Sequence, residues 1–203
     1  MEVWNSQLTE KSWEILQEIR KKYKFILIGG WAAYLWTKQQ KSKDIDIIVD
    51  IQELQKLKKE NLSKNDNLKK YEIKTGEIDI DIYVAYFSKL TIPAEDMEDY
   101  TSEIEGFTVA SKEALLILKQ GAEKERGDSV KGEKDKIDIV SLLFFSDIDF
   151  NKYKTILKKY KLEDYIDRVL SLLRTFNDYN RVNMTPREFK QKKMKLINEI
   201  RKL

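Results

Sequence analysis

Two short segments of the sequence place carboxylates at alternate positions among isoleucines, as Asp44-Ile45-Asp46 and Asp79-Ile80-Asp81. In a β-strand, residues two apart point to the same face, so each pair should lie about 7 Å apart along one face. Two such charges repel each other unless water surrounds them or a cation lies between them. Because Ile45, Ile47 and Val49 make a good core face opposite the first pair, we interpret that pair as metal ligands rather than as a solvated outer face.

The second segment offers a third metal ligand if its strand lies beside the first. Three carboxylates and phosphate oxygens give the octahedral oxygen environment that Mg²⁺ prefers, and Mn²⁺ is an alternative. Asp81 is the preferred third ligand, and Asp79 is a competitor that could instead lie at the rim. The sequence contains no Cys and no His. Thiolate zinc sites, thiol nucleophiles and imidazole bases are therefore excluded.

A glycine pair, Gly29-Gly30, separates an apolar run at residues 24–28 from a run rich in Ala and aromatics at residues 31–37. A strand followed by a helix is expected there, and glycines at such a turn let the backbone approach a phosphate. Taken alone, the pair indicates only a tight turn, and it matches neither a dinucleotide-binding fingerprint nor a Walker loop. Lys43 could also reach a phosphate, although a solvated lysine is the plainer interpretation.

A small sheet is needed to position these residues. Strands are expected at about residues 24–28, 44–50, 71–74, 77–86 and 107–109, with a hairpin turn at Thr75-Gly76. Helices are expected at residues 6–23, 31–37 and 51–60, and then at 111–126, 134–145, 150–160, 163–176 and 186–202. The predicted fold class is α+β: a small mixed or antiparallel sheet flanked by helices, followed by an all-helical C-terminal part. The boundary is expected near residue 110.

Charge is divided unevenly along the chain. Residues 1–110 carry 16 Lys and Arg against 20 Asp and Glu, whereas residues 111–203 carry 22 against 15. An acidic part that holds metal and a basic part that meets a polyanion would explain this, as would a plain lysine-rich surface. Most arginines lie near the C-terminus, interleaved with Phe176, Tyr179 and Phe189. Such a surface suits RNA, although aromatic residues more often belong to a core.

Hydrophobic segments are short throughout. The longest apolar runs, such as Val140–Phe145, cannot cross a bilayer, and the N-terminus lacks the pattern of a signal peptide. We therefore expect a cytoplasmic protein without membrane contact.

The conjunction of Gly29-Gly30, a spacer of 13 residues, Asp44-x-Asp46 and a later Asp on a strand resembles the DNA polymerase β-like nucleotidyltransferase superfamily. This resemblance covers about residues 24–85. Residues 114–142 are similar to the second half of minimal nucleotidyltransferases, including those of the abortive-infection toxin type. The resemblance implies a catalytic core at residues 1–110 and a helical domain at residues 111–203 that completes the nucleotide site.

The resemblance also implies an activity. It implies a metal-dependent transferase that moves a nucleoside monophosphate from an NTP, ATP included, to an acceptor hydroxyl and releases pyrophosphate. Asp44 and Asp46 would hold two Mg²⁺ ions, and Asp81 would coordinate the second ion and lower the pKa of the attacking hydroxyl. Backbone N–H groups around Gly29-Gly30 would stabilise the leaving pyrophosphate. Many family members carry Gly-Ser here, and Gly30 offers no hydroxyl to the triphosphate.

For the helical part, the resemblance implies that Lys119 contacts nucleotide phosphates and that Asp135 or Asp138 supports it. Arg126 lies seven residues from Lys119, on the same helix face. The basic C-terminal half favours RNA or tRNA as the acceptor. If the chain is the toxin of a toxin–antitoxin pair, an antitoxin protein would be its partner. Two alternatives are a catalytically degenerate regulator that binds nucleotide or a partner, and a helical nucleic-acid-binding module.

Overall fold

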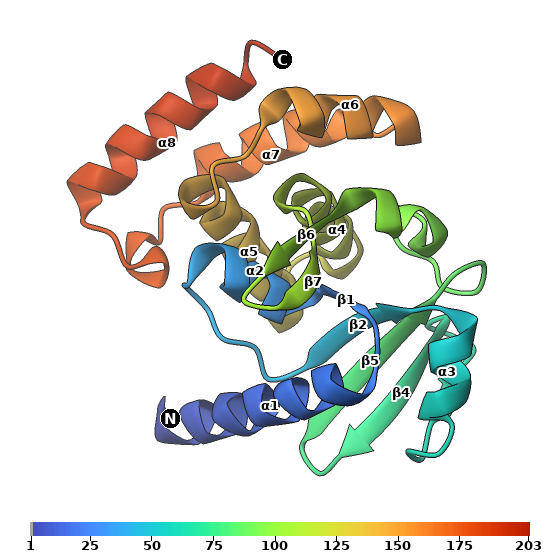
Figure 1. Ribbon diagram of the computed structural model, residues 1–203. Helices are drawn as coiled ribbons and strands as arrows, with labels where there is room; N and C mark the ends of the chain where they lie inside the picture. Colours follow the sequence, from blue (N-terminus) through green and yellow to red (C-terminus); the bar gives the residue numbers. More distant parts are fainter. Residues whose placement is uncertain (1) are drawn as a thin grey trace. The chain divides into compact units, whose positions relative to one another are not determined.

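The computed structural model describes residues 2–203, with side chains from residue 6 onward. The chain folds into two compact units, Met1–Ser111 and Lys112–Leu203 (Figure 1). The first contains a mixed sheet with helices, and the second is helical. The predicted α+β fold class is confirmed. None of the helices in the described part of the chain is long and apolar enough to cross a bilayer.

The first unit is built on a sheet with strand order β3-β4-β5-β2-β1-β7-β6. Its strands are β1 (Ile26–Ile28), β2 (Ile45–Val49), β3 (Ser63–Asn65), β4 (Lys70–Thr75), β5 (Ile78–Val84), β6 (Thr101–Ile104) and β7 (Phe107–Ala110). Strand β2 is antiparallel to β1 and parallel to β5, which places the two acidic segments on neighbouring strands at the centre of the sheet (Figure 1).

The two central strands bury alternate side chains, as their sequences predict. In β5 the isoleucines and Val84 are buried, while Asp79, Asp81 and Tyr83 are only partly buried on the other face. Helix α1 (Glu2–Lys22) covers the apolar face, where Ile15 and other isoleucines of the helix and sheet line a cavity of about 400 Å³. The carboxylates therefore lie on the face of the sheet opposite α1.

Three shorter helices connect the strands of this unit. They are α2 (Gly29–Thr37), α3 (Ile51–Leu57) and the 3-10 helix η1 (Ala94–Tyr100). The side chain of Asp50 accepts a hydrogen bond from the backbone N–H of Glu53 and so caps α3. Helix α2 begins directly at the glycine pair.

The second unit is a helical assembly. It consists of α4 (Lys112–Arg126), α5 (Val130–Phe145), α6 (Phe150–Tyr160), α7 (Asp164–Thr175), the 3-10 helix η2 (Tyr179–Val182) and α8 (Pro186–Ile200). Thr185 and Glu188 form a capping box at the start of α8, with Pro186 at the first helical position as predicted. Phe189 packs against Phe144 and Phe176, so part of the aromatic set is core.

Four local predictions were wrong. The hairpin turn lies at Gly76-Glu77 instead of Thr75-Gly76, because Thr75 pairs with Ile78 and Gly76 adopts a φ of +66°. Strands β3 and β6 lie in segments where no strand was expected; both are short, polar edge strands without a hydrophobic pattern. Helix α5 begins four residues early, because the Ser129 side chain accepts the N–H of Gly132 and caps it.

Candidate functional site

Asp46 and Asp81 lie opposite each other on two adjacent parallel strands. The register of β2 and β5 pairs Asp46 with Asp81, and both side chains are partly buried on the face opposite the core. Asp79 is two residues away from this position, and its partner across the hairpin is Lys74. The sheet therefore brings Asp81, rather than Asp79, beside Asp46.

Asp44 lies immediately before β2, in a bend, and so is outside the strand in which it was expected. Its Oδ1 atom is buried and has no hydrogen-bond partner among residues 6–203. A buried carboxylate oxygen without a partner costs stability, and a cation is one group that would offset this cost. The neighbouring Lys43 is exposed.

Gly29 packs directly against Asp46. A Cβ atom at Gly29 would lie 2.1 Å from Oδ2 of Asp46 and 2.7 Å from its Cβ, and the φ of Gly29 is +67°. Ile28, the preceding residue, pairs with Asp46 across β1 and β2. The first glycine of the pair is therefore required by the left-handed backbone and by contact with a carboxylate. Gly30 is buried in the first turn of α2.

The N-terminus of α2 lies at this turn. Among residues 6–203, no side chain caps it, and its first turn contains no acidic residue. The first N–H groups of a helix lack intrahelical acceptors, and the helix dipole favours an anion there. The turn beside Asp46 can therefore receive a phosphate oxygen.

Lys70 was missed by the sequence analysis. Its Nζ atom lies 2.6 Å from Oδ2 of Asp81 and 3.2 Å from Oε1 of Glu72, and the lysine side chain is only 13% exposed. Lys70, Glu72 and Asp81 lie on one face of the β4–β5 hairpin. The alternation of Lys70, Glu72 and Lys74 along β4 was the available signal, although it could be used only once the hairpin register was known.

Burial, two neighbouring carboxylates and one lysine set the pKa of Asp81. Burial raises it above its ordinary value, and the charge of Asp46 raises it further, while the hydrogen bond from Lys70 acts in the opposite direction. The pKa of Lys70 is itself raised: burial lowers it, but the two acidic partners outweigh that effect. The Lys70 ammonium is thus the cation that Asp81 contacts in this structure.

The carboxylate oxygens of Asp44, Asp46 and Asp81 are the donor type that Mg²⁺ and Mn²⁺ prefer. The unpartnered oxygen of Asp44 also fits a hard cation. Among the described residues, however, no group of three or more acidic side chains is close enough to hold a metal. The residues therefore fit a divalent ion in chemical type, and Lys70 would have to share or release Asp81 for three carboxylates to act together.

The second unit gathers the four predicted residues of its own sequence motif. Lys119 is 7% exposed, and its Nζ lies 2.6 Å from Oδ2 of Asp138 and 3.2 Å from Oδ1 of Asp135. Arg126 donates to the other oxygen of Asp135, at 2.8 Å. This buried network joins α4 to α5, and two carboxylates already hold the Lys119 ammonium. That Lys119 contacts a nucleotide stays a prediction.

No protein-family model matches the chain, and no curated protein matches its sequence. Solved structures do resemble it. A protein from H. pylori that is provisionally called a nucleotidyltransferase is 17% identical, with a TM-score of 0.50, over 96% of this chain and 93% of that one. JHP933 from Helicobacter pylori is 18% identical, with a TM-score of 0.49, over 100% of this chain and 93% of its own.

An antigenic nucleotidyltransferase-like protein from Paracoccidioides brasiliensis is 19% identical, with a TM-score of 0.44, over 68% of this chain and 76% of its own. At such identities the similarity is one of fold. It rests on the H. pylori structure with the TM-score of 0.50.

Proposed function

We propose that this chain, which has a nucleotidyltransferase-like fold, uses a divalent cation to transfer a nucleoside monophosphate from an NTP to an acceptor hydroxyl. The bond between the α- and β-phosphates breaks, and pyrophosphate leaves. The observation that carries the proposal is the register of the central strands, which sets Asp46 opposite Asp81. The glycine turn and the uncapped start of α2 adjoin the same carboxylate. A pair of acidic ligands beside a phosphate-binding turn is what metal-assisted phosphoryl chemistry needs.

Asp44, Asp46 and Asp81 would hold Mg²⁺ or Mn²⁺, which when bound neutralises phosphate charge and acidifies the attacking hydroxyl. The chain's own contributions are positional and electrostatic. The N–H groups at the start of α2, around Gly29-Gly30, would receive phosphate oxygens. Exposed Lys43 would add a charge. Asp81, with its raised pKa, is suited to accept the proton of the attacking hydroxyl.

RNA, tRNA included, is the acceptor we propose. Support comes from the C-terminal segment, in which residues 151–203 carry 15 Lys and Arg against 6 Asp and Glu, a net charge of +9. Such a charge attracts a polyanion over several ångströms and suits a nucleic acid better than a neutral acceptor. A role as a toxin, with an antitoxin protein as partner, stays a prediction.

The Lys70–Asp81 ion pair favours a second function. A built-in ammonium already neutralises the carboxylate that would serve as a metal ligand, and Gly30 offers no hydroxyl to a triphosphate. Both features suit a catalytically degenerate regulator of the same fold that binds nucleotide or a partner protein without transferring a group. The proposed transferase requires Lys70 to share or release Asp81, whereas the regulator does not.

Incubation with each of the four α-labelled NTPs, Mg²⁺ and total RNA separates the two functions. If the chain is a transferase, the RNA becomes labelled. The rate of labelling should fall by about 100-fold or more in Asp46→Asn and in Asp81→Asn, and should stay close to the wild-type rate in Asp79→Asn. Circular dichroism of each variant checks that the fold survives. Label in RNA at the wild-type level with Asp46→Asn would sink the transferase proposal. A Mg²⁺-dependent thermal shift with NTP but no label in RNA, or in a cell lysate used in place of RNA, supports the regulator.

A further inference from the structure

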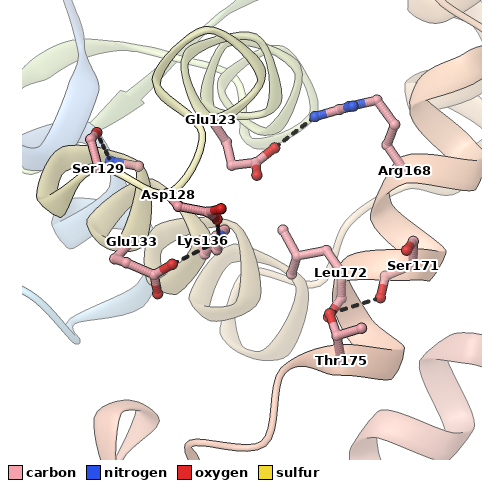
Figure 2. Close-up of polar contacts among 10 residues, drawn as sticks. Glu123, Asp128, Ser129, Glu133, Lys136, Arg168, Ser171, Leu172 and Thr175 are labelled. Carbon is pink, nitrogen blue, oxygen red and sulfur yellow. Dashed lines mark hydrogen bonds and ion pairs between the residues drawn. The ribbon is translucent and has the colours of Figure 1, made fainter.

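A cavity of about 610 Å³ opens within the helical unit. Its walls come from α4, α5, α7 and the segment that follows α7. Figure 2 shows the polar part of these walls: Glu123 of α4 meets Arg168 of α7, and Lys136 of α5 lies across from Leu172. The volume falls within the range of small-ligand sites. Nothing in the proposed transfer chemistry uses these residues.

Each cation that lines the cavity is matched by a carboxylate that also lines it. Arg168 lies 2.9 Å from Glu123, Lys136 lies 2.7 Å from Glu133, and the third pair, Arg181 with Asp178, is 3.1 Å apart. The lining is therefore close to neutral. A neutral lining offers no net attraction for the roughly four negative charges of a triphosphate, whereas a phosphodiester carries only one charge.

Among residues 6–203, most of the guanidinium donors of Arg168 have no hydrogen-bond acceptor. Glu123 accepts one N–H of the guanidinium, and the Nε atom is buried without a hydrogen-bond partner among residues 6–203. Burial of an unsatisfied donor opposes stability, so packing alone does not explain this placement. The side chain remains 38% exposed. Because Nε is buried, the donors that could meet the paired oxygens of a phosphate are the terminal N–H groups that Glu123 does not use.

The remainder of the lining suits a nucleoside. Ile137, Leu172 and Phe176 supply an apolar surface, and Phe176 is braced by Phe189 at 6.2 Å between ring centroids. Lys193 donates to the backbone oxygen of Phe176 and to the neighbouring Asn177 side chain, which fixes this segment. Single-stranded RNA is bound in this way, with bases against aromatic rings and polar groups on their edges.

Hydroxyl and amide groups lie at the edge of this apolar surface. Ser171 and Thr175 of α7 are part of the lining, and the exposed Asn177 follows them. The Thr175 hydroxyl donates to the backbone oxygen of Ser171 (Figure 2) and can still accept a hydrogen bond. These groups can bond the base edge or the 2′-hydroxyl that distinguishes RNA.

We propose that this cavity binds one unpaired nucleotide of a single-stranded RNA, with Arg168 on the phosphodiester and the base against Leu172 and Phe176. The helical unit, residues 112–203, carries 22 Lys and Arg against 15 Asp and Glu, and this net charge of +7 draws the strand toward it. The role of the bound RNA as acceptor rests on the proposed function. The binding itself does not require the transfer reaction.

The test measures binding of a fluorescein-labelled single-stranded RNA of eight nucleotides to the full chain by anisotropy, without NTP or Mg²⁺. Arg168→Gln should weaken binding by about tenfold or more. Arg174→Gln is the matched control: it makes the same charge change on the same helix at an exposed residue outside the lining, and should change binding by about twofold at most. Millimolar ATP should not displace the RNA.

A second variant guards against a folding defect in Arg168→Gln, which leaves Glu123 without its ion-pair partner. Ser171 is exposed at the cavity wall, so Ser171→Glu should fold normally and still repel the phosphodiester. Wild-type affinity in both variants overturns the proposal. So does an equal loss in Arg174→Gln, which would indicate diffuse attraction to basic residues, and so does displacement by ATP.

The transfer assay then separates this inference from the proposed function. If RNA is labelled and both cavity variants raise the KM for RNA with little change in kcat, both proposals stand. If the cavity variants lose RNA binding but the wild type labels no RNA, the inference stands and the proposed function fails. If both variants label RNA with the wild-type KM, the inference fails and the proposed function stands.

Discussion

Gly29→Ala should destabilise the first unit more than any ordinary glycine-to-alanine change. The new methyl group would lie 2.1 Å from Oδ2 of Asp46 and 2.7 Å from its Cβ. Rotation of the aspartate can relieve the first contact but not the second, because Cβ is fixed by the backbone of β2. Alanine must also adopt a φ of +67°. We expect the free energy of unfolding to fall by about 1–2 kcal/mol because of the left-handed backbone, and by a further amount of about 1–3 kcal/mol because of the overlap with Asp46.

Gly76→Ala provides a matched control for the backbone contribution. Gly76 has nearly the same φ, +66°, but the nearest atom to its added Cβ would be Nζ of Lys11 at 3.9 Å. This variant should therefore show the cost of the left-handed conformation alone. The difference between the two variants isolates the contact with Asp46. We expect Gly29→Ala to be the less stable by about 1–3 kcal/mol.

Urea unfolding followed by tryptophan fluorescence measures the difference in unfolding free energy between the two variants for the first unit alone. All four tryptophans of the chain precede residue 112, so the signal reports unfolding of the first unit. The midpoint should shift while the slope stays constant. Asp46→Gly combined with Gly29→Ala removes the overlapping atoms, and the double-mutant cycle should show a favourable coupling of about 1 kcal/mol or more. Equal stabilities of the two alanine variants, or zero coupling, would refute the proposed contact.

Three further predictions concern ionisable groups. Lys119→Met should destabilise the helical unit by about 3–5 kcal/mol, because it leaves Asp138 buried without its cation and removes one of the two cations of Asp135, which keeps Arg126. Chemical unfolding followed by circular dichroism measures this, and a loss no larger than that of Lys124→Met at an exposed ion pair would contradict it. Lys70→Gln should raise the pKa of Asp81 further, since the lysine lowers it. It should also enlarge the thermal shift caused by Mg²⁺, because the competing ammonium is gone. An unchanged or smaller thermal shift would show that Lys70 does not compete for the site. Burial raises the pKa of Tyr153 well above its ordinary value, so the tyrosine stays neutral in the folded state. The free energy of unfolding should therefore fall as pH rises above about 10, where the unfolded tyrosine ionises. Urea unfolding between pH 8 and pH 11 measures this pH dependence, which Tyr153→Phe should reduce.

Strand alternation made the acidic faces predictable, but the register that joins them was not. The run Ile78–Val84 alternates so regularly that its buried and polar faces follow from the sequence alone. Which carboxylate meets Asp46 depends on how β5 aligns with β2, and a shift of two residues would have brought Asp79 there instead. Such a shift keeps every isoleucine in the core, so the hydrophobic pattern cannot detect it.

Contacts between elements far apart in the sequence could not be predicted either. Asp135 and Asp138 are three residues apart on α5, and a helical pattern predicts that they share a face. That this face meets Lys119 of α4 follows from helix packing, which the sequence pattern does not determine. Lys70 escaped notice for the same reason, since its partner Asp81 lies across a hairpin whose turn was placed one residue too early.

The Lys70–Asp81 pair also bears on the order in which the sheet assembles. Strands β4 and β5 are joined by a two-residue turn, so their contacts close a short loop, whereas β2 and β5 must pair across an intervening helix and two strands. Short loops close first because they lose less chain entropy. Lys70 should therefore neutralise Asp81 before β2 brings the Asp46 carboxylate alongside it. The lysine would then act as an internal folding aid, which lets two like charges meet at the centre of a sheet before any ligand is present.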